Sequence, residues 1–298
     1  MVAKDGGNSG FHIFSLSPVH VMEPAILPAM IDAPVTRCVV SCVNDCAGKA
    51  IEKEAICLGA NLVDVAAQWQ ALLDAGKAVV VPAGAVWRVL IDLGRYHCFW
   101  TRIAVSGGLW SRVEISAAES LMDTPGNLNS KSRRDLVDGK FYMGTPDVLL
   151  PDGGTGRVLE PLWWRCGRFV QLLVRVGEQP LIIEGLTLRE TRYPTQPQQA
   201  FRCDDASVQS IAQISLRTLQ MCSHETYMDC PYYEQLMYAG DTRIQSLITM
   251  AIMHDDRLPR KALKLFDASR LNFSELTTDA YPCSSGKLFR RLHCGGWR

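Results

Sequence analysis

The feature that most constrains the fold is a change of hydrophobic period near Pro194. Between residues 79 and 192, apolar and polar side chains alternate, and residues 169–176 place Val170, Leu172 and Val174 on one face. A period of two is typical of β-strands. After the proline-rich segment 193–197, apolar residues recur at the spacing of a helix. The pattern therefore predicts an antiparallel β-sandwich followed by helices.

The same reading divides the chain into segments. Residues 1–78 are expected to be an arm or linker, because the prolines among them exclude long helices, with one short helix between Asn61 and Gly76. A β-sandwich domain is predicted at 79–195, a helical region at 196–282 and an atypical basic tail at 283–298. In the helical region, Asp204 or Asp205 is expected to cap the first helix and Asp241 the second, and a third helix is expected at about 259–271.

Composition narrows the range of partners. The chain has 298 residues, with 31 basic and 31 acidic side chains, so it has no net positive charge to attract nucleic acid. It also contains no run of about 20 apolar residues that would cross a membrane. Because no apolar segment of a signal peptide follows the first ten residues, we expect a cytoplasmic location.

The cysteines do not indicate a metal site. Eleven are present, and four of them form an early group, Cys38, Cys42, Cys46 and Cys57. Structural zinc usually requires two close pairs of ligands, and these spacings do not provide them. We therefore expect thiols without a metal ion.

The segment with the most chemical content is 225–241. It contains four carboxylates, Glu225, Asp229, Glu234 and Asp241, together with four tyrosines. Aromatic rings that stack on sugars beside carboxylates suit glycoside hydrolysis, which needs a proton donor and a second carboxylate. The alternative is an ordinary loop held by helix caps and salt bridges.

Several segments together resemble one family. Residues 229–235, Asp-Cys-Pro-Tyr-Tyr-Glu-Gln, with 238–241 behind them, are similar to the signature of bacterial α-L-rhamnosidases of the six-hairpin, (α/α)6-barrel type. Residues 201–205 and 217–219 resemble the first barrel helix, and 160–165 with 168–172 resemble the strand before it. Residues 90–94 and 105–108 resemble the β-sandwich of that family, so the resemblance covers about 79–282.

This resemblance implies inverting hydrolysis of terminal α-L-rhamnosides without a metal or cofactor. It implies that Glu234 is the general acid and that Asp229 and Asp241 bind sugar hydroxyls. Tyr238 stands where other members carry tryptophan, and we expect it to contact the substrate. The expected partner is a rhamnose-containing glycoside or oligosaccharide.

The resemblance also implies an incomplete catalytic domain. The family places its general base beyond the residues present here, and twelve helices with their loops need about 190 residues, more than 201–298 provide. We therefore expect a fragment that is weakly active or inactive alone, with an apolar edge that favours an oligomer or a complementing chain. The alternative is a non-catalytic carbohydrate-binding or interaction module.

Overall fold

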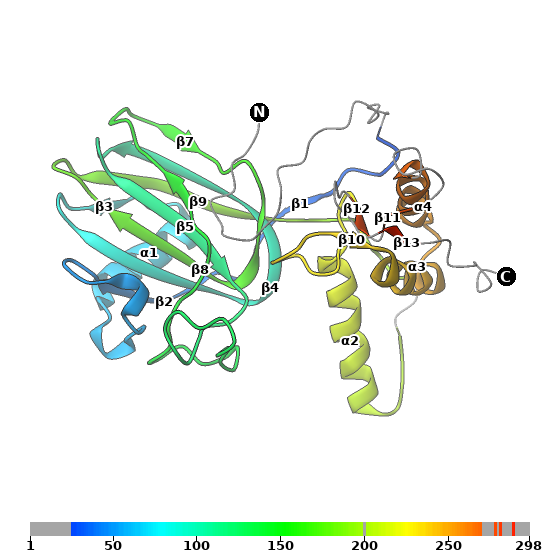
Figure 1. Cartoon of the computed structure of the whole chain (residues 1–298). Coiled ribbons are helices and arrows are strands. Elements are labelled where there is room, and N and C mark those ends of the chain that lie inside the picture. Colours follow the sequence, from blue (N-terminus) through cyan, green and yellow to red (C-terminus); the bar gives the residue numbers. More distant parts are fainter. Residues whose placement is uncertain (1–24, 199–200, 270–276, 279, 282–287, 290–298) are drawn as a thin grey trace. The chain divides into compact units, whose positions relative to one another are not determined.

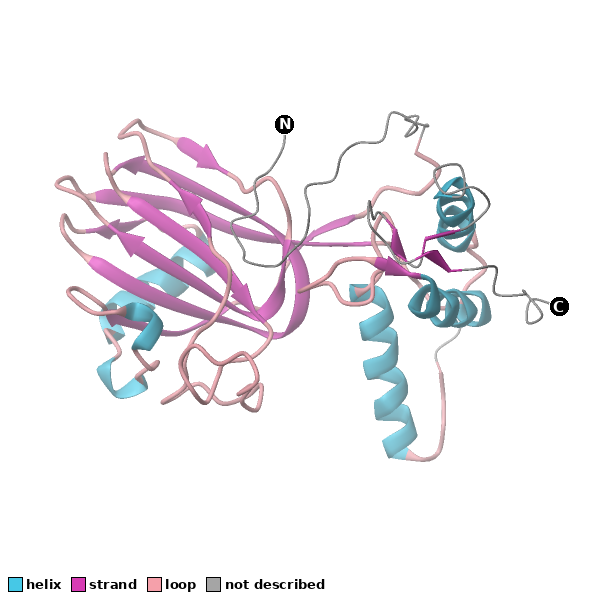
Figure 2. Ribbon diagram, viewed as in Figure 1, coloured by secondary structure: helices cyan, strands magenta, loops and turns pink. Residues whose placement is uncertain are grey.

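The computed structural model describes residues 25–198 and 201–269, together with the strand residues 277–278, 280–281 and 288–289. The chain divides into two compact units. One unit is Ile31–Thr191, and the other combines Met1–Met30 with Arg192–Arg298. Figure 2 shows that the first is dominated by strands and that the second contains most of the helices.

The first unit is built on a nine-stranded sheet. Its strands are β1 (Ile31–Pro34), β2 (Val39–Asp45), β3 (Val79–Val81), β4 (Val86–Gly107), β5 (Arg112–Ala118), β6 (Asp147–Leu149), β7 (Arg157–Leu159), β8 (Arg165–Arg175) and β9 (Leu181–Arg192). The registers of β2 to β9 are antiparallel. The antiparallel β-structure predicted between residues 79 and 192 is therefore confirmed.

Strand β4 organises this sheet. Its first part pairs with β2 and β8, and its second part pairs with β9 and β7 (Figure 1). The register with β8 shifts between Asp92 and His97, and the pairing with β8 continues to Phe99, where the pairing with β9 begins. Because one long strand serves both sets, the sheet folds over a common apolar core.

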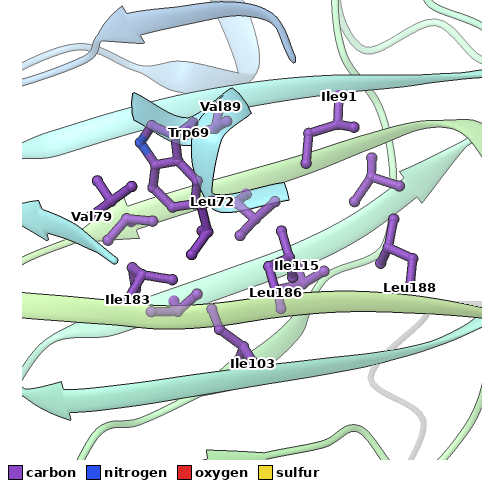
Figure 3. Close-up of a cluster of buried hydrophobic side chains, with 14 of the residues drawn as sticks. Trp69, Leu72, Val79, Val89, Ile91, Ile103, Ile115, Ile183, Leu186 and Leu188 are labelled. Carbon is purple, nitrogen blue, oxygen red and sulfur yellow. The ribbon is translucent and has the colours of Figure 1, made fainter. Parts of the chain in front are cut away.

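The core lies between these two parts of the sheet. Figure 3 shows Val89 and Ile91 from the first part of β4 in the same cluster as Ile103 from its second part and Ile183 from β9. Helix α1 (Val63–Ala75) adds Trp69 and Leu72, which are both buried. The helix ends at Gly76, whose φ of 64° is the left-handed conformation that favours glycine at this position.

Two details at the N-terminal side differ from the sequence-based prediction. Residues 31–45, expected to belong to an arm or linker, form β1 and β2, and β2 pairs with β4. Prolines exclude long helices but still permit short strands at a sheet edge. Asn61 does not cap α1: its Oδ1 instead accepts a hydrogen bond of 2.8 Å from the backbone N–H of Val43 in β2. Short 3-10 helices at Ile51–Lys53 and Leu58–Ala60 connect β2 to α1.

The described part of the second unit contains three α-helices, α2 (Ala206–Met221), α3 (Ala239–Ile252) and α4 (Arg257–Ser269). Asp205 caps α2 as predicted, since its side chain accepts hydrogen bonds from the N–H groups of Ser207 and Val208. The predicted cap at Asp241 is wrong. Helix α3 begins at Ala239, so Asp241 lies inside its first turn, where a carboxylate still complements the helix dipole.

Short strands complete this unit. β10 (Met237–Tyr238) pairs with β12 (Ala280–Tyr281), and β11 (Thr277–Thr278) pairs with β13 (Leu288–Phe289). The predicted tail at 283–298 lies outside the described residues, apart from β13. Among the described helices, none has the length and apolar character needed to cross a membrane.

The second unit has its own small core. One cluster of buried side chains forms this core. It contains Tyr193, Leu219, Tyr227, Met237, Met253, Leu258 and Ala262. The Tyr193 hydroxyl donates a 2.6 Å hydrogen bond to Asp255, whose carboxylate also receives the Arg257 guanidinium. The Arg257 and Tyr193 hydrogen bonds hold the pKa of Asp255 below its usual range. This cluster anchors the two ends of the loop that carries the candidate site.

Candidate active site

The candidate site lies in the loop between α2 and α3, and Asp229 closes this loop. The backbone N–H of Asp229 donates to the carbonyl of Leu236 at 2.8 Å, and Asp229 Oδ1 accepts from the N–H of Leu236 at 3.1 Å. Residues 230–235 therefore form a closed loop between Asp229 and Leu236. Gln235 adopts a positive φ of 53°, which turns the chain sharply before it returns to Leu236.

Glu234 lies in this closed loop and is exposed. Its backbone N–H donates to the sulfur of Cys230 at 3.4 Å. Its carboxylate Oε2 accepts a short hydrogen bond from the hydroxyl of Tyr238, which lies in β10 immediately before α3. Glu234 is thus held at its backbone from one side of the loop and at its carboxylate from the other.

The structure brings the predicted site residues together only in part. Glu234 and Tyr238 are in direct contact, and Asp229 is joined to Leu236, two residues after Glu234. Asp241 is exposed on the first turn of α3, three residues after Tyr238. Asp229 Oδ1 is engaged in holding the loop. That the three carboxyl groups face a single substrate stays a prediction.

Two of the loop's other acidic and aromatic side chains have structural roles. Glu225 forms a 2.6 Å ion pair with Lys261 of α4. Tyr227 is buried, its hydroxyl donates to Thr249 at 2.7 Å, and burial raises the pKa of this tyrosine to about 12. These two residues hold the loop in place. The alternative interpretation, an ordinary loop, expected such a structural role for the whole segment.

The remaining tyrosines are at the surface. Tyr233 is 48% exposed, and its ring meets that of Tyr232 edge to face with centroids 4.6 Å apart. An exposed aromatic face beside a carboxylate is suited to contact with the apolar face of a sugar. Tyr233 is therefore the ring in this loop that is best placed for such a contact.

Sequence reasoning missed two residues that shape the site. Cys230 contributes its sulfur to the Glu234 N–H, and its carbonyl accepts from the N–H of Gln235 at 3.1 Å. Gln245 of α3 donates to the carbonyl of Met228 at 2.7 Å. The Cys-Pro pair in the motif is a signal for a tight turn, but the sequence alone does not show which backbone group the thiol contacts.

The early cysteine group belongs to the sheet unit. Cys42 and Cys46 are buried, Cys57 is exposed, and burial raises the pKa of the Cys42 thiol to about 11. Within residues that the structure describes, no cluster of three or more histidine, cysteine or acidic side chains has an arrangement that could hold a metal ion. A thiol with a raised pKa is also a poor ligand at neutral pH, because metals bind the thiolate.

The loop falls within a known protein family. Residues 197–291 match the family described as the bacterial alpha-L-rhamnosidase 6 hairpin glycosidase domain. This match includes Asp229, Glu234, Tyr238 and Asp241. Residues 197–291 are thus similar to a rhamnosidase domain.

Solved rhamnosidase structures share the fold beyond this segment. The rhamnosidase from Klebsiella oxytoca with rhamnose bound matches with a TM-score of 0.60 and 16% identity, over 87% of this chain and 48% of that chain. The GH78 family rhamnosidase of Bacillus sp. GL1 matches with a TM-score of 0.56 and 22% identity, over 72% of this chain and 21% of that chain. This chain therefore spans less than half the length of either structure.

A curated relative of another kind matches a shorter segment. Over 110 residues, or 37% of this chain, the sequence is 30% identical to a mitochondrial homoaconitase from Aspergillus oryzae. The matched segment is 12% of that protein. So small a share of the homoaconitase carries no inference about the activity of this chain.

Proposed function

We propose that this chain contributes the general acid of an α-L-rhamnosidase-like glycoside hydrolase. The observation that carries the proposal is the placement of Glu234 within the family segment: it is exposed, and it is fixed through its backbone to Cys230 and through its carboxylate to Tyr238. A proton donor must be exposed to its substrate and held in a defined position. Both conditions are met by Glu234.

The proposed reaction is hydrolysis of a terminal α-L-rhamnoside with inversion. Glu234 would protonate the glycosidic oxygen as the bond to the anomeric carbon breaks. Asp229 and Asp241 would accept hydrogen bonds from sugar hydroxyls, and Tyr238 would line the site while it orients Glu234. In an inverting site, water attacks the opposite face with help from a second carboxylate about 6.5 to 9.5 Å from the acid.

The second carboxylate is not assigned to any residue of this chain. We propose that α2, α3 and α4 correspond to the first helices of an (α/α)6 barrel, and that the general base belongs to a later part of that architecture. General acid or base assistance is typically worth about 10² to 10⁴ in rate. Turnover by these 298 residues alone is therefore expected to be weak or absent.

The direct test is release of nitrophenol from a nitrophenyl α-L-rhamnoside by monomer isolated by gel filtration. Two variants are compared, Glu234→Gln and the matched control Glu225→Gln, which removes a carboxylate that is paired with Lys261. We expect slow release that is lower in Glu234→Gln and kept in the control. Equal, measurable turnover in wild type and Glu234→Gln, also with an alkyl rhamnoside whose aglycone is a poor leaving group, would refute the role of Glu234.

Two further outcomes bear on the proposal. Fast turnover that depends on Glu234 would support the acid role but contradict the absence of a base within these residues. Rhamnose binding in calorimetry, with no turnover and no dependence on Glu234, would favour a non-catalytic carbohydrate-binding module.

The leaving group of the substrate gives a further check. Hydrolysis of a rhamnoside whose aglycone is a poor leaving group should be slowed more strongly by Glu234→Gln, because such a group depends most on protonation.

A further inference from the structure

Two cysteines of the sheet unit lie directly opposite each other on neighbouring strands. Cys98 of β4 pairs with Cys166 of β8 in the antiparallel register. Directly opposite residues of an antiparallel pair have Cα atoms about 4.5 or 5.5 Å apart, depending on the type of pair, and point to the same face. Both distances fall within the range that a disulfide requires.

This arrangement distinguishes the pair from the other cysteine of the same sheet. Cys42 of β2 is opposite Leu90, so it has no thiol across the ladder. Cys98 and Cys166 are both reduced and both buried, at 0% and 2% exposure. The geometry for a cross-strand bond is thus already present in the reduced protein.

Tyr96 completes a small polar group around these sulfur atoms. It lies two residues before Cys98 on β4, on the same face of the strand, and its hydroxyl is 3.2 Å from the sulfur of Cys166. The same hydroxyl is 3.1 Å from Glu119, whose carboxylate is paired with Lys131 at 2.7 Å. Burial raises the pKa of Tyr96, so it remains a protonated phenol that can donate to sulfur.

From this placement we propose that Cys98 and Cys166 are a peroxide-oxidisable dithiol that forms a cross-strand disulfide. In the first step the thiolate sulfur of one cysteine attacks a peroxide oxygen, the O–O bond breaks, and a sulfenic acid and hydroxide form. In the second step the other thiol attacks the sulfenic sulfur, and water leaves with the hydroxyl oxygen. Overall, two thiols and one hydrogen peroxide give one disulfide and two waters.

Burial determines which oxidant can act. An oxidant the size of glutathione disulfide would first form a mixed disulfide with one cysteine, and this adduct would have to fit inside the closed sheet. Hydrogen peroxide is small enough to enter during local opening. Exposed Cys57 and Cys203 are expected to react sooner, but no opposing thiol is described for them in the sheet registers. The structural consequence is a bond between β4 and β8 at the point where β4 changes partners.

In the test, the reduced full chain is treated with hydrogen peroxide. It is then unfolded in the presence of iodoacetamide, which alkylates the remaining thiols, and digested with trypsin. Cleavage after Arg95, Arg102, Arg165 and Arg168 isolates Cys98 in peptide 96–102 and Cys166 in peptide 166–168. We expect these two peptides to appear linked before reduction and separate after it. The linkage should raise the melting temperature by about 5 °C, because it closes a long loop in the unfolded chain.

Variants keep the outcome decisive. Cys98→Ser and Cys166→Ser, and the alanine versions if either serine variant folds poorly, should lose both the linked peptides and the rise in melting temperature. The matched control Cys203→Ser, at an exposed site in the other unit, should keep both. The proposal is overturned if peptides 96–102 and 166–168 remain alkylated and separate after peroxide, or if either cysteine joins a different one.

Discussion

The hydroxyl of Tyr238 donates a hydrogen bond to the carboxylate of Glu234, across the turn that separates them. A general acid must be held where the leaving group can take its proton. The contact fixes the Glu234 carboxyl beside Tyr238, immediately before α3.

This contact predicts a local change at Glu234 when the hydroxyl is removed. Tyr238→Phe keeps the ring and deletes the donor, so the Glu234 carboxyl loses the side-chain hydrogen bond that positions it. The ¹³C signal of the labelled Glu234 carboxyl should change its chemical shift in Tyr238→Phe at neutral pH. Tyr233→Phe, on the same loop, is the control and should leave that signal unchanged.

The strands were predictable where apolar and polar residue types alternate in the sequence. Such alternation indicated parts of β4, β5 and β8, although residues 169–174 of β8 are buried in succession. In β2, whose sequence is Val-Val-Ser-Cys-Val-Asn-Asp, no period of two is visible. The cap at Asp205 was found because a side chain just before a helix can reach its first N–H groups.

The contacts among the candidate site residues could not be predicted from the sequence. The resemblance to the rhamnosidase family indicated Glu234 and Tyr238, yet a sequence motif in a loop does not determine which side chains meet. That information comes from the turn at Gln235 and from the sulfur of Cys230. Both depend on backbone conformations that single-sequence patterns do not encode.

The buried cluster beneath the loop predicts a pH-dependent contribution to stability. The pKa of Asp255 is lowered in the folded state by Arg257 and Tyr193, so its contribution is full above the unfolded value of about 3.9 and declines as pH falls below it. Asp255→Asn should cost about 1 kcal/mol of unfolding free energy at pH 7, allowing for partial exposure.

Urea unfolding at pH 7 and near pH 2 checks this expectation. The difference between wild type and Asp255→Asn should shrink at the lower pH, because Asp255 is protonated in the unfolded chain there and part of its contribution to stability is lost. Asp256→Asn removes an exposed carboxylate paired with Arg260 and should have little effect at either pH. A constant difference for Asp255→Asn would show that the carboxylate charge is not the source of stability.

The core of the sheet unit makes a prediction about packing. Trp69 of α1 is fully buried among residues of β4 and β9, so Trp69→Ala should lower the unfolding free energy by about 3 to 5 kcal/mol. Leu162→Ala, at a side chain that is 82% exposed, should change it by less than about 0.5 kcal/mol. Chemical unfolding monitored by circular dichroism gives both values, and a similar loss in the two variants would contradict the assigned core.

Helix α3 has an unusual distribution of side chains. It buries the polar residues Thr242, Ser246 and Thr249, while Ile244, Leu247 and Ile248 are exposed. A helix in water normally directs its apolar face inward, because burial of apolar surface is worth about 25 cal/mol per Å². The outward apolar face of α3 should therefore drive association of the isolated chain.

Sedimentation velocity over a range of protein concentrations tests this last expectation. Wild-type chain should sediment increasingly as larger species, whereas the double variant Ile244→Gln with Leu247→Gln should remain mostly monomeric. Val80→Gln changes an exposed apolar residue of β3 in the other unit and is the matched control, so it should associate like wild type. If the double variant and the control associate equally, the exposed face of α3 is not the surface involved. If the double variant is monomeric but loses its helical circular dichroism, the less disruptive Ile248→Ala should still reduce association measurably, because it removes apolar area without adding a polar group.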